Sequence, residues 1–113
     1  MPVITIETFI KARAERVFDL STSIELHMQS TKTTNEIAIA GRTTGLIKLG
    51  ETVTWRAKHL GIYQQLTVEI TAYERPLFFE DKMLKGIFKS MHHKHQFVPH
   101  EEGTIMIDVF TYK

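Results

Sequence analysis

Histidines concentrate in one short segment, Ser90–Phe97, which reads SMHHKHQF. Three of the six histidines in the chain lie there, at positions 92, 93 and 95. Imidazoles at this spacing suit a metal site or acid/base catalysis, because histidine titrates near neutral pH and is a common metal ligand. They can equally be polar side chains in the wall of a cavity. The choice depends on which of these side chains share a face, and therefore on whether the segment is a strand or a helix.

The segment is expected to be a strand, in which alternate side chains share a face. His92 and Lys94 then point one way, toward solvent. The other face carries two large apolar residues and is expected to line the interior; its members are Met91, His93, His95 and Phe97.

A metal site would need three or more nitrogen or oxygen ligands that converge at about 2 Å. His93 and His95 are two residues apart on one strand, with roughly 7 Å between their α-carbons, a spacing that can chelate an ion. His59 is the candidate third ligand, but the expected order of strands places two others between it and the histidine strand. We therefore expect no metal site.

Acid/base catalysis needs an imidazole within reach of a substrate, often held by a carboxylate. The strands expected beside the histidine strand carry three acidic residues, Glu80, Asp81 and Asp108. The register at Leu84–Ile87 decides whether Glu80 or Asp81 faces inward, because a slip of one residue exchanges the two. His93 and His95 are therefore candidates for a general base. The simplest interpretation is that both form hydrogen bonds with neighbours or water inside a cavity of mixed polarity.

The composition narrows the class of protein. A chain of 113 residues is enough for one domain, and 42% hydrophobic with 24% charged residues is typical of soluble globular proteins. The formal net charge of +1 argues against a dedicated nucleic-acid binder. The chain has no cysteine, which excludes disulfides and thiolate metal sites and fits a reducing compartment. Neither a signal peptide nor an apolar run of about 20 residues is evident, so we expect a cytoplasmic protein without membrane insertion.

Hydrophobic periodicity predicts a strand, two short helices and a β-rich remainder. Val3–Lys11 alternates as a strand, whereas Ala12–Leu20 carries a helical stripe of Ala14, Val17, Phe18 and Ser21. Ser23 is placed to cap a second helix at Ile24–Gln29, and the polar residues Thr31–Asn35 are expected to form a loop. Further strands with mostly short connections are expected at Glu36–Ala40, Glu51–His59, Ile62–Tyr73, Leu77–Met83, Phe88–Val98 and Thr104–Tyr112, which together make an antiparallel meander.

The tight turn expected at Leu60-Gly61 gives a register that can be checked for consistency. A two-residue turn sets Trp55 opposite Leu66 and His59 opposite Ile62. One face of the hairpin is then apolar except for His59 and Gln64, while the reverse face is polar. Such a separation of polar and apolar faces is expected of a correct register.

Three stretches resemble the START-like superfamily, also called SRPBCC or polyketide cyclase/dehydrase-like proteins. They read RAERVFDLSTSIELHMQS, GLIKLGETVTWRAKHLGIYQQLTVEIT and FFEDKMLKGIFKSMHHKHQFVPHEEGTIMIDVFTYK. The last two are similar to an uncharacterised bacterial subgroup, in which a Trp-x-Ala-x-His-x-Gly strand precedes a Phe-rich hairpin and a His-x-His-x-Phe strand. The resemblance covers essentially the whole chain and implies one START-like domain over residues 1–113. It implies an α+β helix-grip fold, in which a curved antiparallel sheet wraps around two short N-terminal helices, but not a particular activity.

Members of this superfamily normally end with a long helix that packs across the concave face of the sheet. The chain stops at Lys113, just after the last expected strand, so we expect a domain that is C-terminally truncated relative to the superfamily. The sheet would then expose apolar residues such as Trp55, Leu66, Val68 and Ile70, and a large exposed apolar patch is rare on a monomer. We expect a second copy of the chain, a swapped segment or a bound lipid-like molecule to cover this face.

Together these observations favour a module that binds a hydrophobic or amphipathic small molecule in a cavity on the concave face, without a cofactor. The residues expected to line the wall are Trp55, Leu66, Phe79, Met91 and Phe97. Those expected to orient the polar end of the ligand are His59, Gln64, His93 and His95. Two alternatives stay open: a cyclase/dehydratase-type enzyme with His93 or His95 as general base, and a regulatory domain that uses the sheet as a protein interface.

Overall fold

The described chain contains two helices and seven strands. The computed structural model describes residues 2–31 and 35–113, and the side chain of His59 lies outside this description, as do residues 32–34 of the expected polar loop. The elements in chain order are β1 (Val3–Ile10), α1 (Ala14–Ser21), α2 (Ile24–Ser30), β2 (Ile37–Gly41), β3 (Thr52–His59), β4 (Ile62–Glu74), β5 (Phe78–Lys85), β6 (Met91–His100) and β7 (Gly103–Tyr112).

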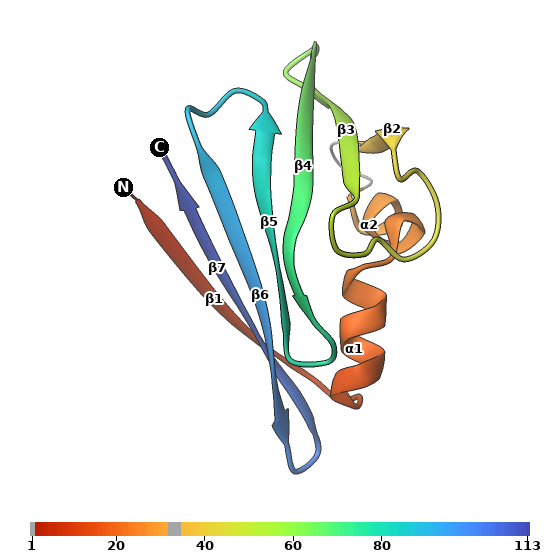
Figure 1. Ribbon diagram of the computed structural model, residues 1–113, viewed down its shortest axis with the longest axis vertical. Helices are drawn as coiled ribbons and strands as arrows, with labels where there is room; N and C mark the ends of the chain where they lie inside the picture. The colour runs from red at the N-terminus through yellow and green to blue at the C-terminus, as the bar shows by residue number, and fades with distance from the viewer. Residues whose placement is uncertain (1, 32–34) are drawn as a thin grey trace.

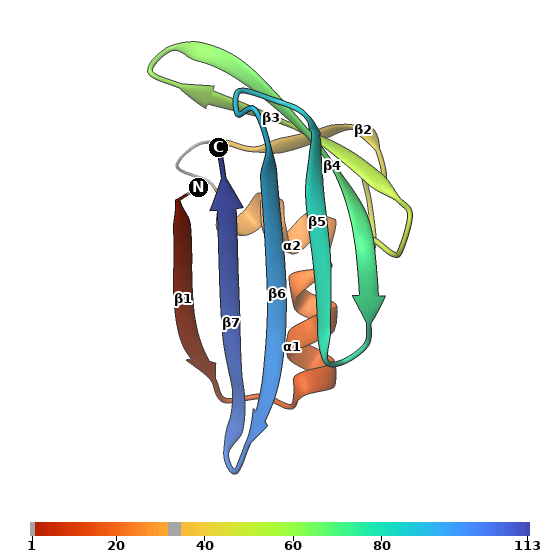
Figure 2. The same ribbon diagram turned by 60° about the vertical axis from the view of Figure 1, so that its left-hand side comes forward.

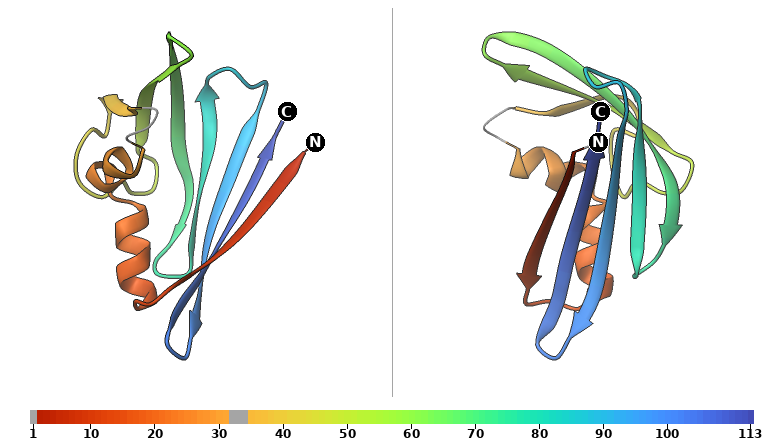
Figure 3. Two further views of the ribbon diagram at one scale, coloured as in Figure 1. Left: turned by 180° about the vertical axis from the view of Figure 1, so that it is seen from behind. Right: turned by 90° about the vertical axis from the view of Figure 1, so that its left-hand side faces the viewer.

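The strands form a single sheet in the order β1-β7-β6-β5-β4-β3-β2. Each pair of neighbours is antiparallel, so β2 to β7 run as the expected meander and β1 adds to its far edge beside β7. The sheet is twisted and curved, and both helices lie on one of its faces (Figures 1 and 2). The view from the side shows the same two layers (Figure 3). The predicted α+β helix-grip architecture is therefore confirmed.

Phe18 of α1 anchors the helices to the sheet. Its side chain is fully buried and meets three aromatic rings edge-on, those of Tyr73, Phe79 and Phe97, with ring centroids 5.2 to 5.4 Å apart. Such edge-to-face pairs add to the free energy gained by burying the rings. The predicted helical stripe is confirmed, since Ala14 and Val17 are buried beside Phe18.

Ser23 caps α2 as predicted, because its hydroxyl oxygen accepts a hydrogen bond from the backbone N–H of Leu26. This cap fixes where the second helix begins. Neither of the two described helices is long and apolar enough to cross a membrane.

One predicted strand begins later than expected. The sequence suggested Phe88–Val98, but β6 starts at Met91. Residues 86–89 bend between β5 and β6 instead, and Phe88 packs its ring from this bend against Phe110 and Tyr112. The apolar character of Phe88 therefore reflects packing on β7 rather than membership of a strand.

The expectation of an exposed apolar sheet face is wrong for three of the four residues that it named, while the fourth, Leu66, is partly buried. Trp55, Val68 and Ile70 are each less than 10% exposed without any partner chain. The helices and Ile47 shield them; the His27 ring of α2, for example, lies over Trp55 with ring centroids 4.0 Å apart. Exposed apolar side chains gather instead on the edge strand β1, at Val3, Ile4, Ile6 and Phe9.

The predicted register of the β3–β4 hairpin is confirmed, with Trp55 opposite Leu66 and His59 opposite Ile62. Both residues of its turn have positive φ angles, 52° for Leu60 and 82° for Gly61. Two positive φ angles are typical of a type I′ turn. Glycine and asparagine adopt this conformation readily, whereas leucine is strained in it. The Leu60 side chain is 99% exposed, so it gains no packing in return.

We expect Leu60→Asn to stabilise the protein by about 1 kcal/mol, because asparagine tolerates the left-handed conformation that leucine resists. Urea denaturation of both proteins would measure the difference. As a matched control, Leu60→Ala removes the exposed apolar surface but keeps a β-carbon without the asparagine amide, and it should give little of the gain. A lower midpoint for Leu60→Asn would contradict this account of the turn.

Candidate functional site

Three neighbouring strands bring two histidines and two aspartates together on the inner face of the sheet. On β6, His93 and His95 point inward. The β5–β6 register sets Asp81 opposite His93, and the β6–β7 register sets Asp108 opposite His95. Because paired residues share a face, all four side chains meet above the central strand. The choice between Glu80 and Asp81 that the sequence left open is thereby settled in favour of Asp81.

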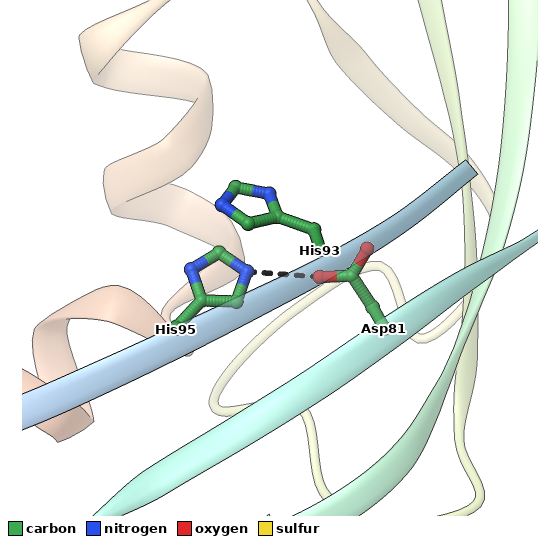
Figure 4. A group of neighbouring side chains, drawn as sticks. All are labelled: Asp81, His93 and His95. Carbon is green, nitrogen blue, oxygen red and sulfur yellow. Dashed lines mark hydrogen bonds and ion pairs between the residues drawn. The ribbon is translucent and has the colours of Figure 1, made fainter. Parts of the chain in front are cut away.

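Hydrogen bonds link the four side chains in a continuous chain. His95 bonds to Asp81 through Nε2, with 2.9 Å to Oδ2, and to Asp108 through Nδ1, with 3.1 Å to Oδ1. His93 bonds through Nε2 to the same Oδ1 of Asp108, also at 3.1 Å. The two imidazoles stack with ring centroids 3.7 Å apart, and Asp81 lies beside them (Figure 4). We refer to Asp81, His93, His95 and Asp108 as the His/Asp cluster.

Burial and hydrogen bonding act in opposite directions on the charges of the cluster. Burial alone would lower the pKa of His95, but the hydrogen bonds to Asp108 and Asp81 outweigh it, so the pKa of His95 is raised. Burial would raise the pKa of Asp108, yet the hydrogen bonds from His93 and His95 hold that pKa well below its ordinary value. Both shifts favour the charged forms, an imidazolium at His95 and a carboxylate at Asp108.

The third histidine of the segment has a different environment. His92 lies on the outer face, as predicted, where its Nε2 is 2.6 Å from Oε1 of Glu80. Its side chain is 45% exposed, against 17% for His95. The SMHHKHQF segment therefore divides into an inner pair of imidazoles and one outer imidazole at the surface.

Three members of the His/Asp cluster, Asp81, His93 and His95, border a cavity of about 310 Å³ between the helices and the sheet. This volume lies at the lower end of the range for small-molecule pockets. Its walls are mostly apolar and come from α2, β3, β4, β5, β6 and β7. The apolar lining includes Ile24, Ile47, Val53, Trp55, Leu66, Val68, Ile70, Phe79, Phe88, Met91 and Phe110.

Most of the residues expected at a ligand site border this cavity: Trp55, Leu66, Phe79, Met91, His93 and His95. Gln64 lies instead at an adjoining hollow of about 180 Å³, which Trp55 and Leu66 also border. Phe97 borders neither, because it is buried in the core against Phe18. His59 lies at the end of β3, and its side chain is outside the described residues.

Sequence reasoning missed a second polar spot in the cavity wall. His27 of α2 bonds through Nε2 to Oε1 of Glu36 at 2.9 Å, and both residues border the cavity. A signal for His27 was present, because the Ser23 cap starts the helix at Ile24 and residues three apart share a helix face. Nothing comparable marks Glu36, which precedes β2 and depends on how the chain returns to the sheet.

We expect Asp108→Asn to lower the free energy of unfolding by about 1.5–3 kcal/mol, because it removes a partly buried charge that accepts hydrogen bonds from both inner histidines. Chemical denaturation at neutral pH would measure the loss. Glu80→Gln is the matched control, since it removes the carboxylate partner of the outer histidine. The His92 side chain is 45% exposed, and an ion pair at the protein surface contributes about 0–1 kcal/mol. Equal losses in the two variants would mean that the inner cluster contributes no more than a surface pair.

Comparison with known proteins shows the fold of this chain and not its family. No family model matches the chain, and no curated protein matches it. Solved structures do match. The major latex-like protein 151 of Panax ginseng has a TM-score of 0.72 at 18% identity, covering 99% of this chain and 78% of its own.

Two bacterial structures are also similar. Protein Ms6760 of Mycobacterium smegmatis has a TM-score of 0.75 at 20% identity, covering 97% of this chain and 71% of that protein. A protein of Thermus thermophilus has a TM-score of 0.78 at 22% identity, covering 99% of this chain and 74% of that protein. At such low identity the likeness concerns the fold alone: this chain has a helix-grip fold shared by plant and bacterial proteins.

Proposed function

We propose that the protein binds an amphipathic small molecule in the cavity, with its apolar body against the sheet and its polar end at the His/Asp cluster. The observation that carries this proposal is a cavity of about 310 Å³ with mostly apolar walls, in which the titratable side chains gather at two places, the His/Asp cluster and the His27–Glu36 pair. Small-molecule sites combine these features, since the apolar walls supply affinity and a few polar groups supply orientation. Burial of ligand surface contributes about 25 cal/mol per Å² before the costs of association.

The charges of the cluster limit which polar groups a ligand can place beside it. Asp81 and Asp108 both carry a carboxyl group, and His95 is already hydrogen-bonded to both. An anionic ligand group placed here would be repelled by Asp108, whose lowered pKa favours the charged form, whereas a hydroxyl or phenol could donate to a carboxylate oxygen. The proposal is therefore specific for a neutral hydrogen-bond donor on an apolar frame, such as an isoprenoid alcohol or an aromatic phenol, over a fatty acid.

Binding of 2-naphthol and of 2-naphthoate tests this preference, because the two share a ring system and differ in the polar group. We expect 2-naphthol to bind at least tenfold more tightly, since only the hydroxyl can donate to the cluster. Titration calorimetry would give both affinities, and Trp55, the one tryptophan of the chain, provides an independent fluorescence signal from the cavity wall. Equal affinities, or tighter binding of the naphthoate, would count against the proposed orientation.

Val68→Phe tests whether the ligand binds in the inner cavity, because Val68 borders the cavity and a phenyl ring there would fill part of it. Glu69→Phe adds the same ring to the neighbouring position of β4, whose side chain faces the other side of the sheet. Only the first variant should weaken binding of 2-naphthol. If Glu69→Phe weakens binding equally, the ligand does not occupy the inner cavity.

A second candidate function is that of a cyclase/dehydratase-type enzyme. The hydrogen bonds of the two inner histidines favour one of them as its general base. His95 has both ring nitrogens bonded to carboxylates, so neither is available to a substrate. His93 uses Nε2 for Asp108, which would hold the Nδ1 lone pair toward the cavity as a general base. We infer that His93, rather than His95, would abstract a proton from carbon next to a substrate carbonyl and leave an enolate.

Proton exchange of 2-tetralone in D₂O would detect such a base, because abstraction and return of an α-proton exchanges it for deuterium without any other reaction. Wild-type protein is expected to accelerate the exchange by about 10²–10⁴-fold. His93→Ala should abolish the acceleration and His92→Ala, on the outer face, should preserve it. NMR would follow the exchange, and an unaccelerated rate with the wild-type protein would exclude this candidate for ketones of this class.

A further inference from the structure

Three side chains of the His/Asp cluster form a potential ligand set for a metal ion. One donor atom each from Asp81, His93 and His95 lies within 4.8 Å of the others. Two imidazole nitrogens and one carboxylate oxygen suit Zn²⁺ and neighbouring divalent transition metals, and three protein ligands are the number found in sites that keep a position open. The sequence led to the opposite expectation, because it looked to His59 for the third ligand. The fold supplies Asp81 instead.

Asp108 gives this arrangement a feature that a chance cluster would lack. It accepts hydrogen bonds from Nε2 of His93 and from Nδ1 of His95. Asp108 thus takes one nitrogen of each ring. The other nitrogens are Nδ1 of His93 and Nε2 of His95, and the latter is bonded to Asp81, itself a proposed ligand. In both rings this nitrogen lies on the side of Asp81 (Figure 4). Metal-binding histidines commonly donate their second ring N–H to a carboxylate in the same way, which fixes the orientation of the ring.

The three ligand atoms lie within 4.8 Å of one another, so side-chain rotations would have to bring them to the spacing that an ion requires. Ligand atoms on a tetrahedral Zn²⁺ ion, with bonds near 2.1 Å, stand about 3.4 Å apart. Nε2 of His95 and Oδ2 of Asp81 are already 2.9 Å apart, so an ion would replace the proton that joins them and separate the two atoms slightly. The side chains of Asp81, His93 and His95 are 12%, 25% and 17% exposed, so the cavity, rather than bulk solvent, supplies the remaining space.

We propose that Asp81, His93 and His95 bind a divalent transition-metal ion such as Zn²⁺, with Asp108 as the positioning residue and the open coordination position toward the cavity. This goes beyond the proposed binding of an amphipathic molecule, because it requires no organic ligand. Its test therefore uses the metal alone, and either proposal can fail without the other.

Calorimetric titration of the chelator-treated protein with ZnCl₂ tests the site. We expect one Zn²⁺ per chain and a rise in the melting temperature, because an ion that binds the folded state stabilises it. Titration with CoCl₂ should give visible absorption bands at the same stoichiometry. Asp81→Asn keeps the shape of the side chain but removes the anionic ligand, and it should weaken binding at least tenfold. Asp108→Asn should weaken it about 10- to 100-fold, as expected for a residue that orients ligands.

His92→Ala is the matched control, because it removes an imidazole from the same strand on the outer face. It should leave affinity and stoichiometry unchanged, and circular dichroism would establish that each variant is folded. The proposal is overturned if the wild-type protein binds no Zn²⁺ at 1:1 stoichiometry. It is also overturned if folded Asp81→Asn binds as tightly as the wild type, or if His92→Ala alone removes binding, since the ion would then sit at the surface.

Discussion

Antiparallel pairing of β6 with β5 on one side and with β7 on the other is the constraint on which the interior of this protein depends. It sets Asp81 across from His93 and Asp108 across from His95. Because side chains alternate along a strand, a slip of one residue in the β5–β6 register would bring Glu80 inward and turn Asp81 to solvent. The two imidazoles would then face the longer side chain of Glu80 in place of Asp81, and the short hydrogen bond from His95 to Asp81 would be lost. In the observed register Glu80 pairs with His92 on the outer face.

Packing divides the space between helices and sheet into a solid part and a hollow part. At α1, Phe18 fills the space with an aromatic cluster that includes Phe79 and Phe97. Beyond α1 the helical layer continues only with the short helix α2, and the side chains there leave about 310 Å³ unfilled. Phe79 belongs to both parts, because it packs on Phe18 and stacks on the His95 ring at 4.1 Å. The core thus holds one of the rings that support the cluster.

The chemistry of the cavity follows from placing titratable side chains among mostly apolar walls. Hydrogen bonds to a charged group are stronger where less water surrounds it, and those of His95 and Asp108 shift both pKa values toward the charged forms. The Asp108 carboxylate repels anions and attracts hydrogen-bond donors or cations. A hydroxyl on an apolar ligand and a divalent ion therefore suit the same end of the cavity for one electrostatic reason. An ion bound by His93 would also occupy the nitrogen that a general base needs, so metal binding and proton abstraction by His93 exclude each other.

The sequence by itself determined the type of each element, the inward side of the SMHHKHQF segment and the β3–β4 register. Local patterns encode all three, since periods of 2 and 3.6 residues and a two-residue turn are readable from neighbours in the chain. The likeness to START-like proteins supplied the helix-grip layout. Only the tertiary structure decided that Asp81 faces inward, that Phe97 joins the core rather than the cavity, and that α2 covers Trp55. These outcomes depend on where the bend at residues 86–89 closes and on how the helices lie over the sheet, and both result from packing between residues far apart in the chain.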